Sequence, residues 1–172
     1  LMGVFVTLYN YLGYHLLAPP YHLSQTVVGL IFSVYLVGTF SSAWMGQQAT
    51  RYGRGRVLTI AFGLIGAGIV LLSMPWLTTM ALGIALVTFG FFGGHSVASS
   101  WVGSRAGSMR AEASALYLFA YYLGSSVLGA VGGLAYAAWD WLGVCLFTGV
   151  LTLLGGGIIW ALQQRAPQPV AA

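Results

Sequence analysis

Long uncharged stretches, separated by a few charged positions, are the dominant pattern along the chain. Residues 1–50 and 57–104 contain no Asp, Glu, Lys or Arg, and neither do residues 113–139 and 141–164. A membrane-spanning helix needs about 20 predominantly apolar residues, so each of the two longer stretches can hold two helices and each shorter stretch can hold one. The pattern therefore predicts six transmembrane helices.

Helix-breaking residues divide the two longer stretches near their middles. Pro19 and Pro20 cannot continue a helix, Ser24 is a favourable N-cap for the helix that follows, and Pro75 interrupts the second stretch. The predicted helices, with ends set to within about 2–4 residues, span residues 2–18, 25–45, 57–74, 79–102, 111–138 and 141–162. We expect an all-α integral membrane fold in which residues 1–172 form one six-helix bundle.

The composition indicates that lipid is the main solvent of this bundle. The chain is 59% hydrophobic and 5% charged, with a mean hydropathy of +0.88, whereas soluble domains average roughly 25% charged residues. These few charged side chains cannot coat a water-soluble bundle. The net charge of +4 comes from arginines in short loops and not from a broad basic face, which argues against nucleic-acid binding.

The arginines alternate between the predicted connections. All six lie between helices 2 and 3, between helices 4 and 5, or after helix 6: Arg51, Arg54, Arg56, Arg105, Arg110 and Arg165. The positive-inside rule then places these segments, and with them both termini, in the cytoplasm. Between the second and third helices the chain must also reverse direction, and Gly53 and Gly55 permit a tight turn there.

The segment GQQATRYGRGR, residues 46–56, resembles the cytoplasmic signature of the major facilitator superfamily, G-x-x-x-D-R-x-G-R-R/K. The matching residues are Gly46, Arg51, Gly53, Arg54 and Arg56. Thr50 stands where the family has its acidic residue. A charge latch on the cytoplasmic side would therefore use Arg105, Arg110 and Glu112, or a part of the protein outside this sequence.

Four longer stretches resemble the C-terminal half of drug- and sugar-efflux members of that family, near the acriflavine-sensitivity branch. They read YNYLGYHLLAPPYHLS, VGLIFSVYLVGTFSSAWMG, GFFGGHSVASSWVGSRA and YLFAYYLGSSVLGAVGG. The resemblance implies helices 7 to 12 of a twelve-helix transporter in a bacterial inner membrane, and we expect that an N-terminal half is missing from this sequence. It also implies alternating-access transport of a small molecule, namely efflux of an amphipathic drug-like compound or a sugar, with proton coupling left open.

Polar side chains inside the predicted helices are the candidates for lining a solute cavity. They are Asn10, Tyr11, Tyr14, His15, Tyr35, His95, Tyr117, Tyr121 and Ser125. Ionisable groups at membrane depth usually face a cavity or a partner, and His95 can titrate near neutral pH. The alternative for each residue is a satisfied hydrogen bond between helices. A cavity with these side chains and no Arg or acid suits uncharged, amphipathic solutes.

Other functions find less support in the residues. The three histidines are scattered and Cys145 is single, so we expect no metal site, and no motif indicates a cofactor. An intramembrane serine protease would need a histidine after Ser125 or Ser126, and none follows. A water channel of the familiar type needs Asn-Pro-Ala turns, which are absent. We expect no enzymatic activity, and a six-helix channel or an intramembrane enzyme remains the alternative.

Overall fold

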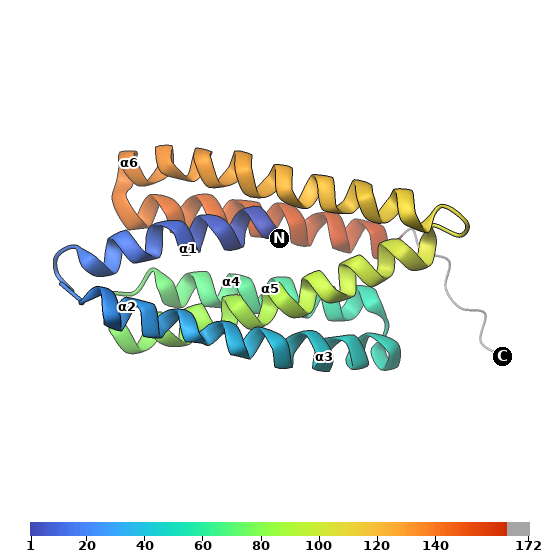
Figure 1. Ribbon diagram of the computed structural model, residues 1–172, viewed down its shortest axis with the longest axis horizontal. Coiled ribbons are helices and arrows are strands. Elements are labelled where there is room, and N and C mark those ends of the chain that lie inside the picture. Colours follow the sequence, from blue (N-terminus) through green and yellow to red (C-terminus); the bar gives the residue numbers. More distant parts are fainter. Residues whose placement is uncertain (165–172) are drawn as a thin grey trace.

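The computed structural model describes residues 1–164 as helices joined by short connections (Figure 1). The elements are α1 (Met2–Leu17), α2 (Gln25–Ile31), the 3-10 helix η1 (Phe32–Val34), α3 (Tyr35–Tyr52), α4 (Arg54–Leu72), α5 (Leu77–Arg105) and α6 (Arg110–Gln164). These residues contain no strand, so the prediction of an all-α fold is confirmed. Arg165, which belongs to the arginine pattern of the sequence, lies outside the described residues.

The element α6 consists of two antiparallel arms. Trp139 (φ −142°, ψ 29°) and Asp140 (φ 48°, ψ −143°) leave the helical conformation, and the chain reverses there (Figure 1). We call residues 110–138 the first arm and residues 141–164 the second arm. Four helical stretches are long and apolar enough to cross a membrane: Gln25–Tyr52, Arg54–Leu72, Leu77–Arg105 and Arg110–Gln164. The count of six spans stays a prediction.

Most helix ends lie within three residues of their predicted positions, with one clear exception. The second helix was expected to end at residue 45 but continues through α2, η1 and α3 to Tyr52. The apolar run measures the part of a helix inside hydrocarbon, whereas helical hydrogen bonding continues into the interface where arginine side chains are solvated. The predicted N-cap is confirmed, because the Val27 amide donates to the Ser24 hydroxyl over 3.3 Å.

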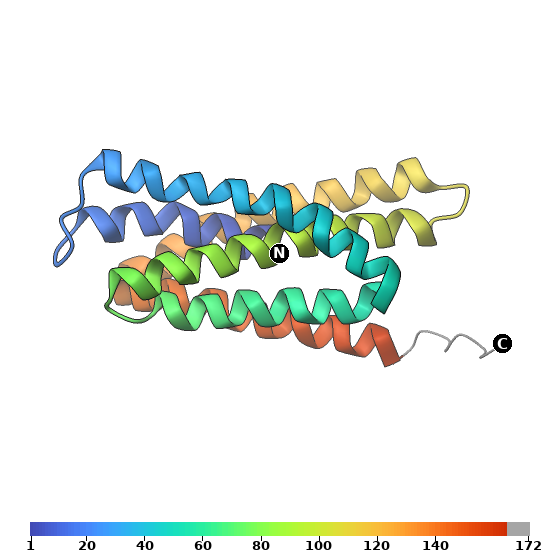
Figure 2. The same ribbon diagram turned by 90° about the horizontal axis from the view of Figure 1, so that it is seen from below.

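The helices form a near side and a far side in the view of Figure 1. α4 and the second arm of α6 lie together on the far side, and they occupy the lower edge of Figure 2. α5 contacts both α3 and α4, so it joins the two sides. α4 and α5 approach closely at glycines: a Cβ added to Gly83 would lie 2.7 Å from the Gly68 carbonyl oxygen.

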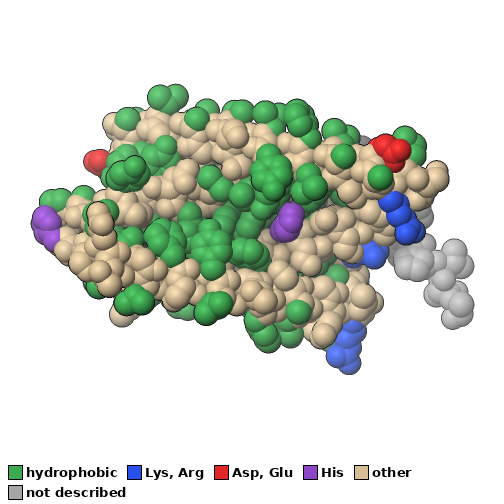
Figure 3. Space-filling view, viewed as in Figure 1, with side chains coloured by type: hydrophobic (Ala, Val, Ile, Leu, Met, Phe, Trp, Pro, Cys, Tyr) green, Lys and Arg blue, Asp and Glu red, His purple; other side chains and the backbone are tan. Residues whose placement is uncertain are grey.

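The cationic side chains gather at one end of the bundle (Figure 3). This end holds the junction between α3 and α4 and the connection between α5 and α6 (Figure 1). At the opposite end, the buried Trp141 indole donates to the Leu72 carbonyl oxygen over 2.7 Å. That bond satisfies one of the carbonyls that the last turn of α4 leaves without an intrahelical partner.

Candidate functional site

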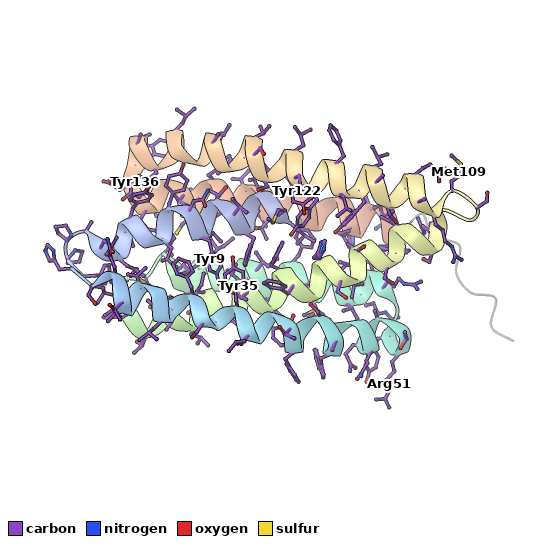
Figure 4. All side chains as sticks on the ribbon, in the orientation of Figure 1. Tyr9, Tyr35, Arg51, Met109, Tyr122 and Tyr136 are labelled. Carbon is purple, nitrogen blue, oxygen red and sulfur yellow. The ribbon has the colours of Figure 1, made fainter. Side chains whose placement is uncertain are left out.

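Aromatic rings fill the middle of the near side of the bundle. We call them the central aromatic cluster: Phe5 and Tyr9 of α1, Phe32 of η1, Tyr35 of α3, and Phe91 and Phe92 of α5. The rings of Phe5 and Phe91 stack with centroids 3.9 Å apart. Figure 4 shows Tyr9 and Tyr35 next to each other, midway along the bundle. Phe5 and Tyr9 of α1, Phe91 and Phe92 of α5 and Tyr35 of α3 are in ring contact, so the cluster brings three helices together.

Tyr35 occupies the exposed edge of this cluster. Its ring stands steeply inclined to those of Phe5, Tyr9 and Phe92, with centroid distances of 5.5, 4.9 and 5.6 Å. The side chain is nevertheless 41% exposed. Tyr35 directly follows η1, and the Ser33 hydroxyl there donates to the Leu30 carbonyl over 2.7 Å. A 3-10 turn inside a long helix often marks a hinge, and the exposed ring directly follows such a turn in a helix that stays continuous from Gln25 to Tyr52.

Tyr9 is held by a buried hydrogen bond to α5. The Thr88 hydroxyl donates to the Ile84 carbonyl over 2.7 Å, which uses its one proton. The Tyr9 hydroxyl, 2.6 Å from the same Thr88 oxygen, must therefore be the donor of the second bond. Tyr9 thus ties α1 to α5 and fixes one wall of the cluster.

His95 extends the cluster toward the first arm of α6. Its Nδ1 lies 2.8 Å from the Tyr117 hydroxyl oxygen, and its ring centroid lies 4.7 Å from that of Tyr121. Tyr117 and Tyr121 are four residues apart and share one helix face. Phe91 connects this His95 group to the cluster, with centroids 6.1 Å from His95 and 6.4 Å from Tyr121.

The structure places Tyr35, His95, Tyr117 and Tyr121, four of the predicted cavity residues, in one continuous region. Among the described residues, the hydrogen bonds leave the hydroxyls of Tyr35 and Tyr121 without a protein partner. Tyr35 is an exposed side chain, at 41%. Among the non-exposed residues of the described part, every fully buried polar side-chain atom has a partner, so the Tyr121 hydroxyl opens onto the accessible surface. Free hydroxyls at mid-depth call for water or a polar solute, because lipid cannot satisfy them.

Other predicted cavity residues lie elsewhere on α1 and α6. Tyr11 donates to the Gly129 carbonyl over 3.1 Å and stacks on Tyr136, so it packs against the first arm. Asn10 and Tyr14 are exposed, Tyr14 by 65%. Ser125 is half-buried on the first arm. These four do not join the His95 group.

His15 lies at the opposite end of the bundle from the arginines. Its ring stacks on Trp141 with centroids 5.0 Å apart and meets Tyr21 edge-on at 5.3 Å. The Tyr21 hydroxyl donates to the Pro75 carbonyl over 2.7 Å, and partial burial raises the pKa of Tyr21 above its ordinary value. His15 is thus part of a group that links the end of α1 to the break in α6, away from the central aromatic cluster.

The residues of the predicted signature lie where α3 meets α4. Gly53 alone joins the two helices, with φ 90° and ψ 140°, a region that favours glycine. Gly46 and Arg51 belong to α3, whereas Arg54 and Arg56 belong to α4. Gly55 was expected in the turn but lies inside α4, because that helix begins at Arg54, directly after Gly53.

The predicted latch residues lie at this same end of the bundle. Arg110 begins α6, with Glu112 in its first turn. The Arg105 guanidinium lies over the Trp101 ring, 4.9 Å from its centroid. This position is a cation–π contact within α5. A latch between helices therefore stays a prediction.

The described residues contain no group of three His, Cys, Asp or Glu side chains that could hold a metal ion. Cys145 is buried. The polar and aromatic groups instead provide stacking surfaces and a few hydrogen-bonding atoms. Such an arrangement can hold an organic solute.

Sequence reasoning missed Tyr9 and the phenylalanines of the central aromatic cluster. Phe5, Tyr9, Leu12 and Leu16 recur at three- or four-residue intervals on α1, and all are buried. This spacing is the ordinary signal for a core-facing stripe. It could have shown that Tyr9 points inward, in contrast to Tyr14.

Comparison with known proteins accords with the helical, apolar architecture. The model of the Major Facilitator Superfamily matches residues 1–172. The MFS-type transporter YybF of Bacillus subtilis is 48% identical over 93% of the chain and 39% of its own length. The inner membrane transport protein YnfM of Escherichia coli is 46% identical over 96% of the chain and 40% of its own length.

A third relative, a transporter of Buchnera aphidicola, is 37% identical over 95% of the chain and again over 40% of its own length. The chain therefore spans about two fifths of the curated relatives it matches. No solved structure gives a significant match. The extent of the family match and the level of identity establish that this integral membrane chain belongs to the major facilitator superfamily.

Proposed function

We propose that this chain forms the C-terminal six-helix half of a transporter that moves a small amphipathic solute by alternating access. The observation that carries the proposal is the region formed by Tyr35, which is 41% exposed, and the half-buried His95 and Tyr121. The hydroxyls of both tyrosines have no protein partner, and Tyr35 lies midway along the bundle (Figure 4). Binding at the midplane, between halves that rock against each other, is the arrangement that alternating access requires. The printed names of YybF and YnfM, both transporters, support the same function.

The membrane and its orientation follow from the same proposal. YnfM is named as an inner membrane protein, and we infer a bacterial inner membrane for this chain. The described arginines share one end of the bundle, and the positive-inside rule favours the cytoplasm for that end. The end of α6 at Gln164 would then be cytoplasmic, whereas the N-terminus of this chain lies midway along the bundle (Figure 1) and so does not match the expected cytoplasmic position. The signature residues at Gly53 and the latch residues near Glu112 would then both lie on the cytoplasmic side of this half.

Efflux coupled to protons is the finer form of the proposal. Both carboxylates of the described part lie at helix ends, Glu112 in the first turn of α6 and Asp140 at its break. His95 is the ionisable group that lies beside the central aromatic cluster. We assign it the role of proton acceptor. Protonation would change its hydrogen bond to Tyr117 and thereby the contact between α5 and the first arm.

Counterflow in vesicles tests the transport function. In the protein to be tested, this chain replaces its matched 165-residue segment of YnfM. Vesicles containing this chimera are loaded with one unlabelled solute at a time, and the same solute in labelled form is added outside. The panel of solutes is a hexose, a planar aromatic cation and a planar aromatic anion. A carrier accumulates the labelled solute transiently and saturably, because exchange needs only the loaded carrier to reorient. Flux that is linear with concentration and unaffected by solute on the opposite side would instead establish a channel.

The role of His95 is tested with His95→Gln in the same vesicles. The variant should lose accumulation driven by an imposed pH gradient and keep counterflow, since exchange requires no net proton movement. Tyr117→Phe is the matched control, because it removes the hydrogen-bond partner but leaves the imidazole able to titrate. Gradient-driven transport that persists in His95→Gln would return His95 to a packing role.

A further inference from the structure

We propose, on the basis of the transport function above, that Gln163, Thr59 and Gly55 form an uncharged latch at the arginine-bearing end of the bundle. The latch holds the end of the second arm of α6 against the first turns of α4, and it stays closed while the transporter reorients. Gln163 is then a positioning residue for the junction at Gly53, where the signature residues lie. We call these three residues the Gln163 latch.

Two hydrogen bonds link the second arm to the start of α4. The Thr59 hydroxyl donates to the Gly55 carbonyl oxygen over 3.2 Å, which uses its one proton. The side-chain Nε2 of Gln163 donates to the same Thr59 oxygen over 2.8 Å. Gln163 lies in the last turn of the described part of α6, and Gly55 follows Gly53 by two residues. The bonds therefore run from the end of the second arm to the backbone beside the junction.

Gly55 provides the space in which the Gln163 side chain lies. A Cβ added at position 55 would be 2.6 Å from Cγ and 2.8 Å from Cδ of Gln163. The backbone itself does not require glycine there, because the glycines with positive φ are Gly53 and Gly107. Position 55 is also where the signature G-x-x-x-D-R-x-G-R-R/K has its second basic residue. The departure from the signature at this position thus makes room for Gln163.

Two other residues of the signature segment make contacts within their own helix. The Thr50 hydroxyl donates to the Gln47 carbonyl oxygen over 2.7 Å. The Arg51 guanidinium lies 5.7 Å from the centroid of the Tyr52 ring. All four residues belong to α3. The latch, in contrast, joins two helices through neutral groups, so salt should not weaken it as it would weaken an ion pair.

α4 and the second arm also meet at two other depths. At the opposite end of the bundle, the Trp141 indole donates to the Leu72 carbonyl oxygen over 2.7 Å. Farther along both helices, Gly155 packs against the Phe62 ring, and a Cβ on Gly155 would lie 2.8 Å from its Cζ atom. The latch is the third contact. Because the two helices are joined at three depths, we expect them to move as one unit when the halves rock against each other.

Amide hydrogen exchange of the 172-residue chain in phosphatidylcholine nanodiscs tests whether the latch forms. Gln163→Leu cannot donate the bond and should speed the exchange of the amides of residues 57–60 about threefold, the factor for one average hydrogen bond between membrane helices. Gln164→Leu, at the exposed neighbouring position, is the matched control and should leave this exchange unchanged. The protection should persist when salt is raised from about 0.1 M to about 1 M. Equal exchange in the parent chain and Gln163→Leu, or protection that salt removes, would overturn the proposal.

Counterflow by the YnfM chimera tests what the latch does. Gly55→Cys/Gln163→Cys lacks the latch while its thiols are reduced, and its maximal rate should fall about threefold, because the junction is no longer held in position. The half-saturation concentration should not change, since the latch lies away from Tyr35 and His95. Oxidation should form a disulfide, because Gln163 Cγ lies 2.6 Å from where a Cβ on Gly55 would be. The disulfide should restore the rate, and it is counted as the loss of two thiols that react with a maleimide.

Gly55→Arg completes the signature pattern and gives a second reading without cysteines. Its side chain displaces Gln163, so its counterflow should be as slow as that of the reduced double variant. Loss of counterflow on oxidation would show that the latch must open during transport and would overturn the proposal. Full rates in both Gly55→Arg and the reduced double variant would overturn it as well.

The two proposals fail in different ways. Counterflow that Gln163→Leu leaves unchanged would refute the role of the latch and keep transport. Absence of counterflow for every solute with the unmodified chimera would refute transport, and with it the role of the latch in reorientation. Hydrogen exchange would then still decide whether the latch forms, because that measurement needs no solute.

Discussion

In the buried hydrogen bond between Tyr9 and Thr88, the hydroxyl that donates determines which substitution destabilises the protein more. Both residues are almost fully buried, at 7% and 0% exposed. Tyr9 donates to Thr88, and Thr88 donates to the Ile84 carbonyl. Tyr9→Phe removes only a donor, and Thr88 keeps its own bond, so we expect a loss of about 0.6 kcal/mol in the free energy of unfolding. Thr88→Val leaves the buried Tyr9 hydroxyl without an acceptor, and we expect a loss of about 1–3 kcal/mol.

The assay is SDS titration in mixed micelles, followed by circular dichroism, for the parent chain, the two single variants and Tyr9→Phe/Thr88→Val. The double variant should be less destabilised than Thr88→Val, because it no longer contains an orphaned hydroxyl. A larger loss for Tyr9→Phe than for Thr88→Val would refute the assigned donor direction. Equal losses that add in the double variant would show that the two hydroxyls do not interact.

Three further predictions concern packing and orientation. Gly83→Ala should destabilise the bundle by about 1–3 kcal/mol, because the added Cβ would press on the backbone of α4. Gly63→Ala is the control, since its Cβ would have no atom within 4 Å. This control variant should melt no lower than the parent chain. Trp141→Phe should cost about 1–3 kcal/mol by the same titration, since the buried α4 carbonyl loses its donor, and a loss below that found for Tyr9→Phe would contradict this role. Ser73→Cys and Ser108→Cys, introduced one at a time at exposed positions, lie in connections at opposite ends of the bundle. An impermeant maleimide applied to intact cells should label only Ser73→Cys, and labelling of both would reject the orientation. The parent chain, in which Cys145 is buried, gives the background labelling.

The helical architecture could be predicted from the sequence because the features that determine it, long uncharged runs and prolines, extend over many residues or stop a helix outright. Uncharged runs and prolines located the helices, and Ser24 marked a helix start that the structure retains. Charged positions predicted the helix ends less accurately than prolines did. Arg51 lies inside α3, because a helix can extend beyond the hydrocarbon before it ends. The 3-10 turn η1 contains no Gly or Pro. Its one local sign is Ser33, whose hydroxyl competes for a backbone carbonyl.

The candidate site was only partly readable because it depends on how each helix is rotated about its axis. Tyr9, Tyr11 and Tyr14 look alike in the sequence, yet they face α5, the first arm and the accessible surface respectively. Whether His95 reaches Tyr117 depends on the packing of α5 against α6, which no local pattern encodes. Side-chain spacing can show which residues share a helix face, but the identity of the facing helix comes from tertiary structure.

The junction at Gly53 limits how the bundle can move. Only two Cα steps of about 3.8 Å each separate Tyr52 from Arg54, and no slack remains between the helices they end. α3 and α4 are therefore connected by a short hinge at one end and can change their relative angle only about that end. Any opening between them must widen toward the far end, where longer connections hold the neighbouring helices, so the arginine-bearing tip acts as the pivot of the pair.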